Sequence, residues 1–368
     1  MENSQTLWLG RMVLNDFRNY ERAEVEMSPG INLVSGANAQ GKTSLLEGVS
    51  LLSTGRLLRG SKDAQAIRHG AESSTVSCEI GGSGTEIKVV LRRGTKKRVE
   101  LNGTSLPRAS DLIGRLPTVS FSAADLCIVT GDPSDRRQFL DWELAQLSPS
   151  YLKALTVYKR SIEHRNALLR QSQEQVVPAV EFEPWEVQIA AAGTAVRHSR
   201  MEWVQTLELD SREAHSNLGG GETLDLRYEV RDNGNDAESF ASLLESSRGF
   251  DVARGSTSCG PHRDELMILV KGQEARYFGS QGQQRTAVIA MKLATLTSAE
   301  KMLRVTPILL LDDVFSDLDI ARRSRLMDLT LGRGGQVFLT CTEPELAGSG
   351  LLEGSRIFKV ESGQVRVQ

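Results

Sequence analysis

The spacing of hydrophobic and polar residues divides the chain into three parts. In residues 5–125, short alternating or continuous apolar runs predict strands at 7–14, 23–27, 31–35, 74–80, 85–91 and 98–101. Between Pro133 and Asn217, apolar residues recur three and four positions apart, which predicts helices. From about residue 223 strands and helices return, with a very apolar strand at 308–311 and a last strand pair near 336–340 and 356–360.

These parts indicate an α/β protein that carries a helical arm. The polar stretch 171–184 contains Pro178 and Pro184, so we expect it to separate two long helices that fold back on each other as a short antiparallel arm. We expect a first lobe with a mixed sheet over residues 1–125, the arm and a second lobe over 126–250, and the rest of the core over 251–368.

Composition narrows the class of protein. The chain has 368 residues, of which 39% are hydrophobic and 25% charged, as in ordinary globular proteins. Four widely spaced cysteines without a C-x-x-C pair fit a reducing compartment, and no apolar stretch approaches the 18 residues of a membrane span, so we expect a cytoplasmic protein without a membrane partner. A net charge of −3 argues against a generally basic surface, so any binding of nucleic acid would depend on local patches.

The clearest motif is a complete G-x-x-x-x-G-K-T sequence between an apolar strand and a helix start. Its residues are Gly36, Ala37, Asn38, Ala39, Gln40, Gly41, Lys42 and Thr43. In this context the backbone N–H groups and the helix N-terminus would hold the phosphates of ATP. Lys42 would reach the β- and γ-phosphates, and the Thr43 hydroxyl would bind Mg²⁺. The alternative is an ordinary glycine-rich turn.

A pair of carboxylates follows the apolar strand at 308–311. Asp312 and Asp313 would lie at the carboxyl end of a buried strand, where parallel sheets bind ligands. Asp312 would hold Mg²⁺, and Asp313 would orient or deprotonate the attacking water, so Asp313 and Lys42 are the candidate catalytic residues. The alternative is that both carboxylates only end the strand and cap the next element.

A second candidate anion site precedes the helical run 286–296. Ser280 and Gly282 lie just ahead of it, where a helix N-terminus attracts anions. Since the chain already has one phosphate loop, we infer that two protomers bury nucleotide between them, each offering this helix to the γ-phosphate of its partner. A plain capped helix is the alternative.

Six segments in order along the chain make it resemble the RecF family of DNA replication and repair proteins, whose ATPase is of the ABC type. The segments are 16–20, 36–43, 136–141, 259–264, 280–285 and 310–319. The resemblance implies an SMC-like ATPase head with a short arm on its second lobe. It implies ATP-driven homodimerisation, binding of DNA at single-strand gaps or junctions, loading of RecA together with RecO and RecR, and support of the SOS response.

The resemblance also implies roles for particular residues. Arg18 and Asn19 would lie against the nucleotide, Ser280, Gly282 and Gln283 would form the signature segment, and residues 316–319 would be the D-loop that crosses the dimer. Two departures from the wider ABC pattern fit a slow ATPase. Residues 119–125 contain no Q-loop glutamine, and residues 340–342 replace the switch histidine. Two other functions stay open, the nucleotide-binding subunit of a transporter and an ATP-gated clamp without useful turnover.

Charged and titratable residues outside these motifs suggest few further sites. His262 has no ligand-spaced partner, so a structural or nucleotide-linked role is favoured over metal binding. A basic cluster at 92–98 on a predicted hairpin is either a solvated tip or a contact for DNA phosphates. A second basic stripe is predicted on the arm, at Lys159, Arg160, Arg165 and Arg170.

Overall fold

The structure is a computed structural model that describes residues 8–58, 62–219, 221–314, 318–344, 352 and 354–368. The chain forms two compact units. Unit 1 comprises residues 1–126, 217–219 and 292–368, and unit 2 comprises residues 127–216 and 220–291. Unit 2 begins close to the expected boundary at residue 126. It continues to Met291, well past the boundary expected at 250, because residues 265–291 complete its sheet and begin its last helix.

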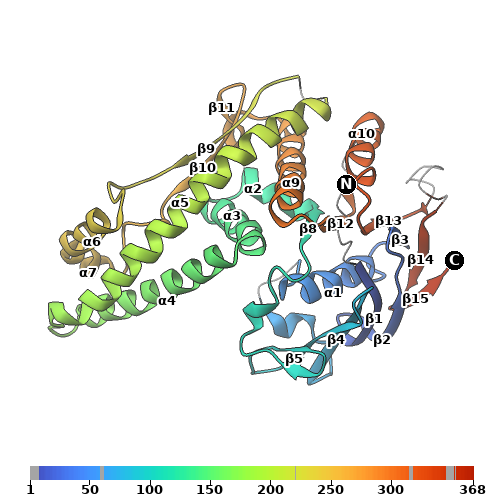
Figure 1. Ribbon diagram of the computed structural model, residues 1–368, viewed down its shortest axis with the longest axis horizontal. Coiled ribbons are helices and arrows are strands. Elements are labelled where there is room, and N and C mark those ends of the chain that lie inside the picture. The colour runs from blue at the N-terminus through green and yellow to red at the C-terminus, as the bar shows by residue number, and fades with distance from the viewer. Residues whose placement is uncertain (1–7, 59–61, 220, 315–317, 345–351, 353) are drawn as a thin grey trace. The chain divides into compact units, whose positions relative to one another are not determined.

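Unit 1 contains an antiparallel sheet of order β2-β1-β4-β5-β6-β7 (Figure 1). Its strands are β1 (Trp8–Phe17), β2 (Tyr20–Glu26), β4 (Ser73–Gly81), β5 (Thr85–Arg92), β6 (Arg98–Leu101) and β7 (Thr104–Ser105). Buried and accessible positions alternate along β4, so one face of the sheet joins the core, which includes Met12, Val76 and Val89. Unit 1 also contains three short 3₁₀ helices, η1 (Asp63–Ala66), η2 (Ala109–Leu112) and η3 (Ala123–Leu126).

The second sheet of unit 1 is mixed and carries the candidate site. Its order is β15-β14-β3-β13-β12-β8, with parallel pairs throughout except between β14 and β15. The strands are β3 (Ile31–Ser35), β8 (Thr118–Ser122), β12 (Ile308–Asp312), β13 (Val337–Cys341), β14 (Arg356–Glu361) and β15 (Gln364–Val367). The strand at 31–35 therefore does not share a sheet with its neighbours in sequence, and it separates the two last strands that were predicted as a pair. Helix α1 (Lys42–Thr54) contacts strands of both sheets, and α10 (Ile320–Leu331) follows β12 in the chain.

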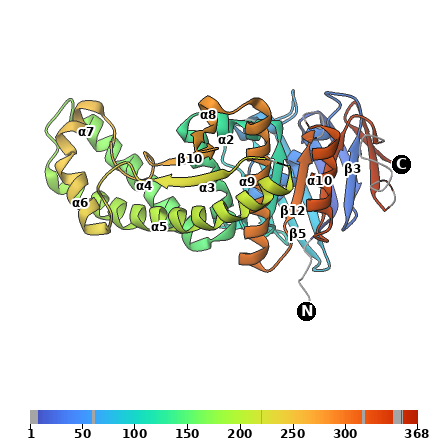
Figure 2. The same cartoon turned by 90° about the horizontal axis from the view of Figure 1, so that it is seen from above.

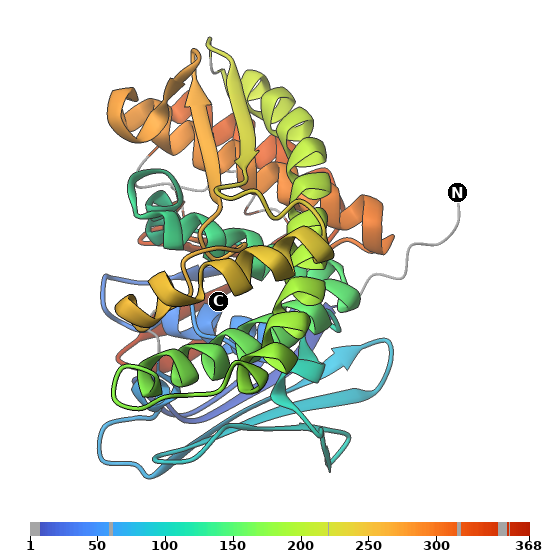
Figure 3. The same cartoon turned by 90° about the vertical axis from the view of Figure 1, so that its left-hand side faces the viewer.

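Unit 2 combines helices with a small antiparallel sheet. Its helices are α2 (Cys127–Thr130), α3 (Pro133–Leu147), α4 (Pro149–Gln171), α5 (Ala179–Asn217), α6 (Ala237–Ser246), α7 (Arg248–Arg254) and α8 (Ala275–Phe278), and it contains the first half of α9 (Gln281–Leu303). The sheet has the order β11-β10-β9, formed by β9 (Leu224–Glu229), β10 (Glu265–Val270) and β11 (Gln273–Glu274); β9 and β10 run side by side in Figure 3.

The predicted arm is a hairpin of α4 and α5, with α6 and α7 beside its far end (Figure 2). Ion pairs and hydrogen bonds join the two helices in antiparallel register, from Arg165 with Glu186 to Tyr151 with Arg200. The polar stretch separates α4 from α5 as predicted, but α5 already begins at Ala179, so Pro184 lies inside the helix instead of before it. Its missing N–H removes one hydrogen bond near the start of a 39-residue helix, and buried Phe182 and Glu186 hold the turn on either side.

The prediction of a basic stripe on the arm is wrong for some of its residues. The Arg165 side chain is completely buried and forms ion pairs with Glu186 and Asp251, at 3.1 and 2.7 Å. Lys159 is half exposed and forms an ion pair of 2.8 Å with Asp141. Only Arg160 and Arg170 of the predicted stripe are exposed without an ion pair among the contacts of the described residues.

Candidate nucleotide site

The phosphate loop leaves β3 and enters α1 through two glycines that no other residue could replace without strain. Gly36 has φ +150°, and a Cβ there would lie 2.3 Å from the Val360 carbonyl oxygen of β14. Gly41 is the N-cap of α1 with φ +122°, and a Cβ there would lie 2.7 Å from Asn19 Nδ2 and 2.9 Å from the Tyr20 hydroxyl. Backbone therefore approaches backbone closely at one end of the loop, and side chains pack against it at the other.

Two neighbouring turns hold the loop in place. From the β1–β2 turn, Asn19 Nδ2 donates to the Gln40 carbonyl at 2.8 Å and the Tyr20 hydroxyl donates to the Gly41 carbonyl at 2.9 Å. From the β14–β15 turn, the Ser362 N–H donates to Gln40 Oε1 at 2.7 Å. These bonds engage the Gln40 and Gly41 carbonyls and the Gln40 side chain, so the second half of the loop is held by both turns.

Lys42 lies at the start of α1 with its ammonium turned over the loop. The Nζ atom donates to the carbonyls of Gly36 at 2.6 Å and Ala37 at 2.9 Å, and only 8% of the residue is exposed. Asn38, Ala39 and Gly41 line the same pocket as Lys42. A partly desolvated ammonium on a phosphate loop is suited to bind a chain of phosphates.

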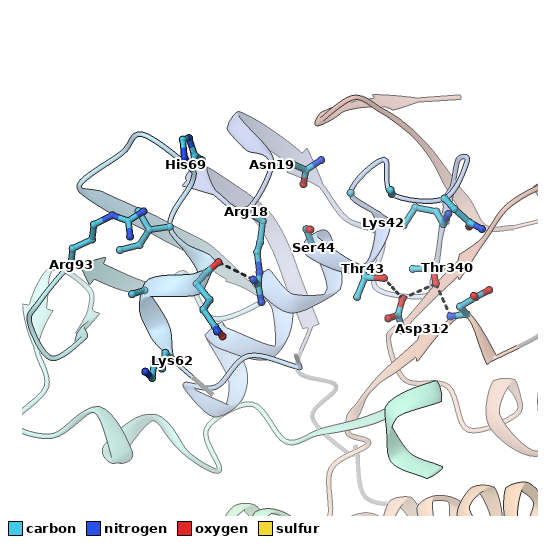
Figure 4. Close-up of a pocket in the computed structure, with 17 residues that line it drawn as sticks. Arg18, Asn19, Lys42, Thr43, Ser44, Lys62, His69, Arg93, Asp312 and Thr340 are labelled. Atoms are coloured by element: carbon cyan, nitrogen blue, oxygen red, sulfur yellow. Dashed lines mark hydrogen bonds between the residues drawn. The ribbon is translucent and has the colours of Figure 1, made fainter. Parts of the chain in front are cut away.

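Three polar side chains from three elements meet beside Lys42. The Thr43 hydroxyl donates to Asp312 Oδ1 at 2.8 Å, and the Thr340 hydroxyl donates to the same oxygen at 3.0 Å (Figure 4). The Asp313 N–H in turn donates to Thr340 Oγ1 at 2.8 Å. The strands β3 and β12 are not neighbours; β13 lies between them, and its Thr340 contacts the Asp312 carboxylate and the Asp313 backbone.

The donor atoms at this point fit a magnesium ion. The Thr43 hydroxyl and the Asp312 carboxylate are hard oxygen donors that already lie 2.8 Å apart. Among the described residues no group of three or more His, Cys, Asp or Glu side chains could hold a metal ion by itself. The donor set therefore fits a cation that shares its coordination with phosphate oxygens and water, which is how Mg²⁺ binds in such sites.

The pocket in unit 1 has a volume of about 850 Å³ and brings most of the predicted residues together. Those that line it are Arg18, Asn19, Asn38, Ala39, Gly41, Lys42, Thr43, Asp312 and Asp313. Gly36, Ala37 and Gln40 are not in the lining, but their carbonyls accept hydrogen bonds from the lining residues Lys42 and Asn19. The remaining lining residues were not predicted to belong to this site; they are Ser44, Lys62, Ala64, Gln65, Ile67, His69, Arg93 from the predicted basic cluster, and Thr340 from the segment in place of the switch histidine.

Arg18 links the pocket to α1 and to the segment around η1. Its guanidinium forms two hydrogen bonds of 2.8 Å with the buried Glu47 carboxylate of α1 and a third with the Gln65 carbonyl. Its backbone N–H donates to Ala66, and Arg68 forms an ion pair of 2.6 Å with Asp16. These contacts connect the β1–β2 turn to the segment that supplies Gln65 to the pocket lining. Lys62 and His69, on either side of this segment, line the same pocket (Figure 4).

The predicted signature segment lies in unit 2 and is not among the residues that line this pocket. Ser280 Oγ accepts the Gln283 N–H at 3.3 Å, and Gln283 Oε1 accepts the Ser280 N–H at 2.8 Å. This reciprocal pair is a capping box, and Gly282 lies within it at the start of α9. Of the predicted D-loop, residues 316 and 317 lie outside the described residues, and Asp319 caps α10 by accepting the Arg322 N–H at 2.9 Å.

The other candidate groups have mainly structural partners. His262 contacts the Tyr158 hydroxyl at 2.5 Å and the Thr257 carbonyl at 3.0 Å, and burial lowers its pKa to about 4. In the hairpin between β5 and β6, Lys97 pairs with Asp63 and Arg98 with Glu100. Within the described part of the chain, no helix combines the length and apolar character that a membrane span requires.

Comparison with known proteins identifies the family. A family model described as the RecF/RecN/SMC N terminal domain matches residues 8–365. A DNA replication and repair protein RecF from Lachnoclostridium phytofermentans is 37% identical over 356 residues, which are 96% of this chain and 97% of that protein. The solved structure of a recombination mediator protein, RecF-ATP in the RecFOR pathway, is similar with a TM-score of 0.90 and 29% identity over 99% of this chain and 98% of that one.

A head domain of Smc bound to the C-winged helix domain of ScpA shares the fold alone, with a TM-score of 0.57 and 15% identity over 98% of this chain and 97% of that one. The expected α/β ATPase head with a mixed sheet and a short helical arm is thereby confirmed. With a family model spanning nearly the whole chain and relatives of this similarity, the chain belongs to the RecF family of DNA replication and repair proteins.

Proposed function

We propose that the protein binds MgATP in the pocket of unit 1. The observation that carries this proposal is the convergence of Lys42, Thr43 and Asp312 on one pocket whose floor is the phosphate loop. The RecF protein of similar structure was solved with ATP, which supports the same ligand here. Lys42 would exchange its bonds to loop carbonyls for bonds to the β- and γ-phosphates.

The residues around Asp312 would have different roles in the hydrolysis of ATP. Thr43 and Asp312 would hold Mg²⁺, which neutralises charge on the phosphate oxygens when it is bound. Asp313 would orient the attacking water and accept its proton, and Thr340 fixes the backbone of Asp313 through the 2.8 Å bond to its N–H. Aspartate is one methylene shorter than the glutamate usual at this position, which fits slow turnover. Arg18 and Asn19 would lie along the nucleotide, as the pocket lining supports.

We further propose that ATP joins two protomers through the capped start of α9. Ser280, Gly282 and Gln283 would approach the γ-phosphate bound by the partner, since a helix N-terminus attracts anions. The dimer would bind DNA at gaps or junctions and act with RecO- and RecR-type mediators to load RecA, and it would thereby support SOS induction. The RecF protein of similar structure is a recombination mediator in the RecFOR pathway, which supports this role. Four free cysteines support a cytoplasmic location.

The Lys42→Ala variant tests nucleotide binding directly. Loss of a charge-assisted contact to phosphate should weaken MgATP binding by about 2–5 kcal/mol, measured by titration calorimetry. Lys62→Ala, at the far wall of the same pocket, is the matched control and should keep most of the affinity. Equal affinity of the parent and Lys42→Ala would refute the assignment of the site.

Of the two alternatives, membership of the RecF family excludes the transporter subunit. A clamp that holds DNA without useful turnover is distinguished by measuring ATP hydrolysis with and without gapped DNA. We expect slow hydrolysis that gapped DNA stimulates. A rate that equals the Lys42→Ala background under both conditions would favour the clamp.

A further inference from the structure

A carboxylate that lies outside the sequence motifs contacts the capping box at the start of α9. Gln283 Nε2 donates to Glu222 Oε1 at 2.9 Å, and the same oxygen forms an ion pair of 3.2 Å with Lys271. Glu222 lies 61 residues before Gln283 in the chain, in the segment that leads into β9. All three residues belong to unit 2.

This contact determines which way the Gln283 carboxamide points. An amide has one oxygen and one nitrogen at its end, and a carboxylate can only accept hydrogen bonds. With its nitrogen bound to Glu222, Gln283 must turn its oxygen toward the Ser280 N–H, which donates to it at 2.8 Å. Glu222 therefore fixes the rotamer that the cap requires.

The cap in turn determines which groups at the helix start remain for a ligand. The Ser280 N–H and the Gln283 N–H are used within the box, and Ser280 Oγ serves as an acceptor there. A hydroxyl that accepts a bond at its oxygen still has its own proton to donate. The Ser280 O–H and the N–H groups of the first helical residues, including Gly282, are thus the donors that an anion can use.

We propose that Glu222 is a positioning residue for ATP-dependent dimerisation, acting by orienting Gln283 and thereby ordering the signature segment that receives the nucleotide of the partner. This inference rests on the proposed dimerisation through α9. Glu222 would not touch the phosphate itself. Hydrogen bonds from Gln283 and Lys271 lower the pKa of Glu222, so it remains an acceptor at neutral pH.

Glu222 has two properties with opposite effects on the dimer. As a hydrogen-bond acceptor it orients Gln283, and as a negative charge it repels an approaching phosphate, so substitutions can separate the two. Glu222→Ala removes both the acceptor and the charge. Glu222→Gln removes the charge and keeps an oxygen that can accept from Gln283 Nε2. If orientation of Gln283 is what matters, the glutamine variant should behave as the parent or better, and only the alanine variant should fail.

The experiment is sedimentation velocity of the full chain with MgATP over a range of protein concentrations. We expect Glu222→Ala to weaken dimerisation by about tenfold for each site that must be reordered, and up to about a hundredfold for a two-fold dimer with two such sites. Glu222→Gln should dimerise at least as tightly as the parent. Lys271→Gln is the matched control; it removes the exposed ion pair but leaves the bond to Gln283, and its dimerisation should change less than about twofold.

Two further measurements distinguish a loss of dimerisation from a loss of ATP binding or of folding. Each variant should bind MgATP as the parent does under conditions where the protein is monomeric, and each should unfold at the same denaturant concentration within error. Parent-like dimerisation of Glu222→Ala, or an equal loss in Glu222→Gln, would overturn the positioning role. If the parent itself stays monomeric with MgATP, the proposed dimerisation fails instead.

Discussion

Thr340 gives the sharpest prediction because its hydroxyl links the Asp312 carboxylate to the backbone of Asp313. It lies on β13, it is only 1% exposed, and it bonds Asp312 Oδ1 at 3.0 Å and the Asp313 N–H at 2.8 Å. Thr340→Val keeps the shape and the β-branched character of the side chain but removes both hydrogen bonds. The strand itself should therefore remain intact.

The loss in free energy of unfolding follows from the two hydrogen bonds that Thr340→Val removes. A hydrogen bond to a charged acceptor contributes about 1.5–3 kcal/mol, and a bond between neutral groups about 0.5–1.5 kcal/mol. Because water has little access to Thr340, solvent cannot easily replace the lost donor and acceptor. We expect the free energy of unfolding to fall by about 2–4 kcal/mol.

Turnover should fall more than nucleotide affinity. Asp312 keeps its bond from Thr43, whereas the backbone of Asp313 loses the bond to β13 that fixes it. A small displacement of a catalytic group from its productive position can lower the rate about tenfold to a hundredfold. Affinity for MgATP should change by about threefold or less, since Lys42 and Thr43 are untouched.

Chemical denaturation, calorimetric titration with MgATP and a turnover assay with DNA measure these three quantities. Thr340→Ser, which keeps the hydroxyl, is the control and should lose less than about 1 kcal/mol in unfolding free energy while it retains activity. If Thr340→Val were as stable and as active as the parent, Thr340 would not be what holds Asp312 and the Asp313 backbone in place.

Two further predictions concern turnover and DNA. Asp313→Asn removes the candidate base and leaves Lys42 intact, so the variant should bind MgATP and accumulate as a dimer in ultracentrifugation; hydrolysis at the parent rate would show that another group is the base. In the β5–β6 hairpin, exposed Arg92 and Lys96 are the charges best placed to reach DNA, because the other basic residues there contact their own chain or line the pocket. Reversing both charges should flatten the dependence of log Kd on log salt by about 0.7 to 0.9 for each DNA phosphate that is no longer bound, and an unchanged slope would direct attention to the exposed arginines of the arm.

The parts of the site that were predicted from sequence are those in which a short local motif determines the geometry. A loop such as 36–43 has its shape set by its own glycines and by the helix after it, and an apolar strand ending in two aspartates sets Asp312 at the edge of the sheet. Contacts between distant residues have no such local signal. The pairing of β3 with β13 and β14, the bond from Arg18 to Glu47 and the bond from Gln283 to Glu222 all depend on tertiary folding.

The sequence contained a signal for the burial of Arg165 that the prediction of a basic stripe did not use. Arg165 continues the three- and four-residue spacing of Tyr151, Leu155 and Tyr158, and this spacing places it on the buried face of α4. Its charge suggested an exposed stripe, yet a buried arginine is possible where carboxylates meet it, and Glu186 and Asp251 do so. Helical periodicity was therefore a better guide to burial at this position than residue type.

Dimerisation through the start of α9 is best tested by sedimentation of the parent beside Gly282→Glu. A bulky carboxylate at Gly282 should exclude the γ-phosphate of the partner while the phosphate loop of the same chain is unchanged. We expect the parent to sediment as a dimer with MgATP and as a monomer without it. We expect Gly282→Glu to bind MgATP with parent affinity but to stay a monomer. A parent that remains monomeric with MgATP, or a Gly282→Glu variant that dimerises as the parent does, would contradict dimerisation through α9.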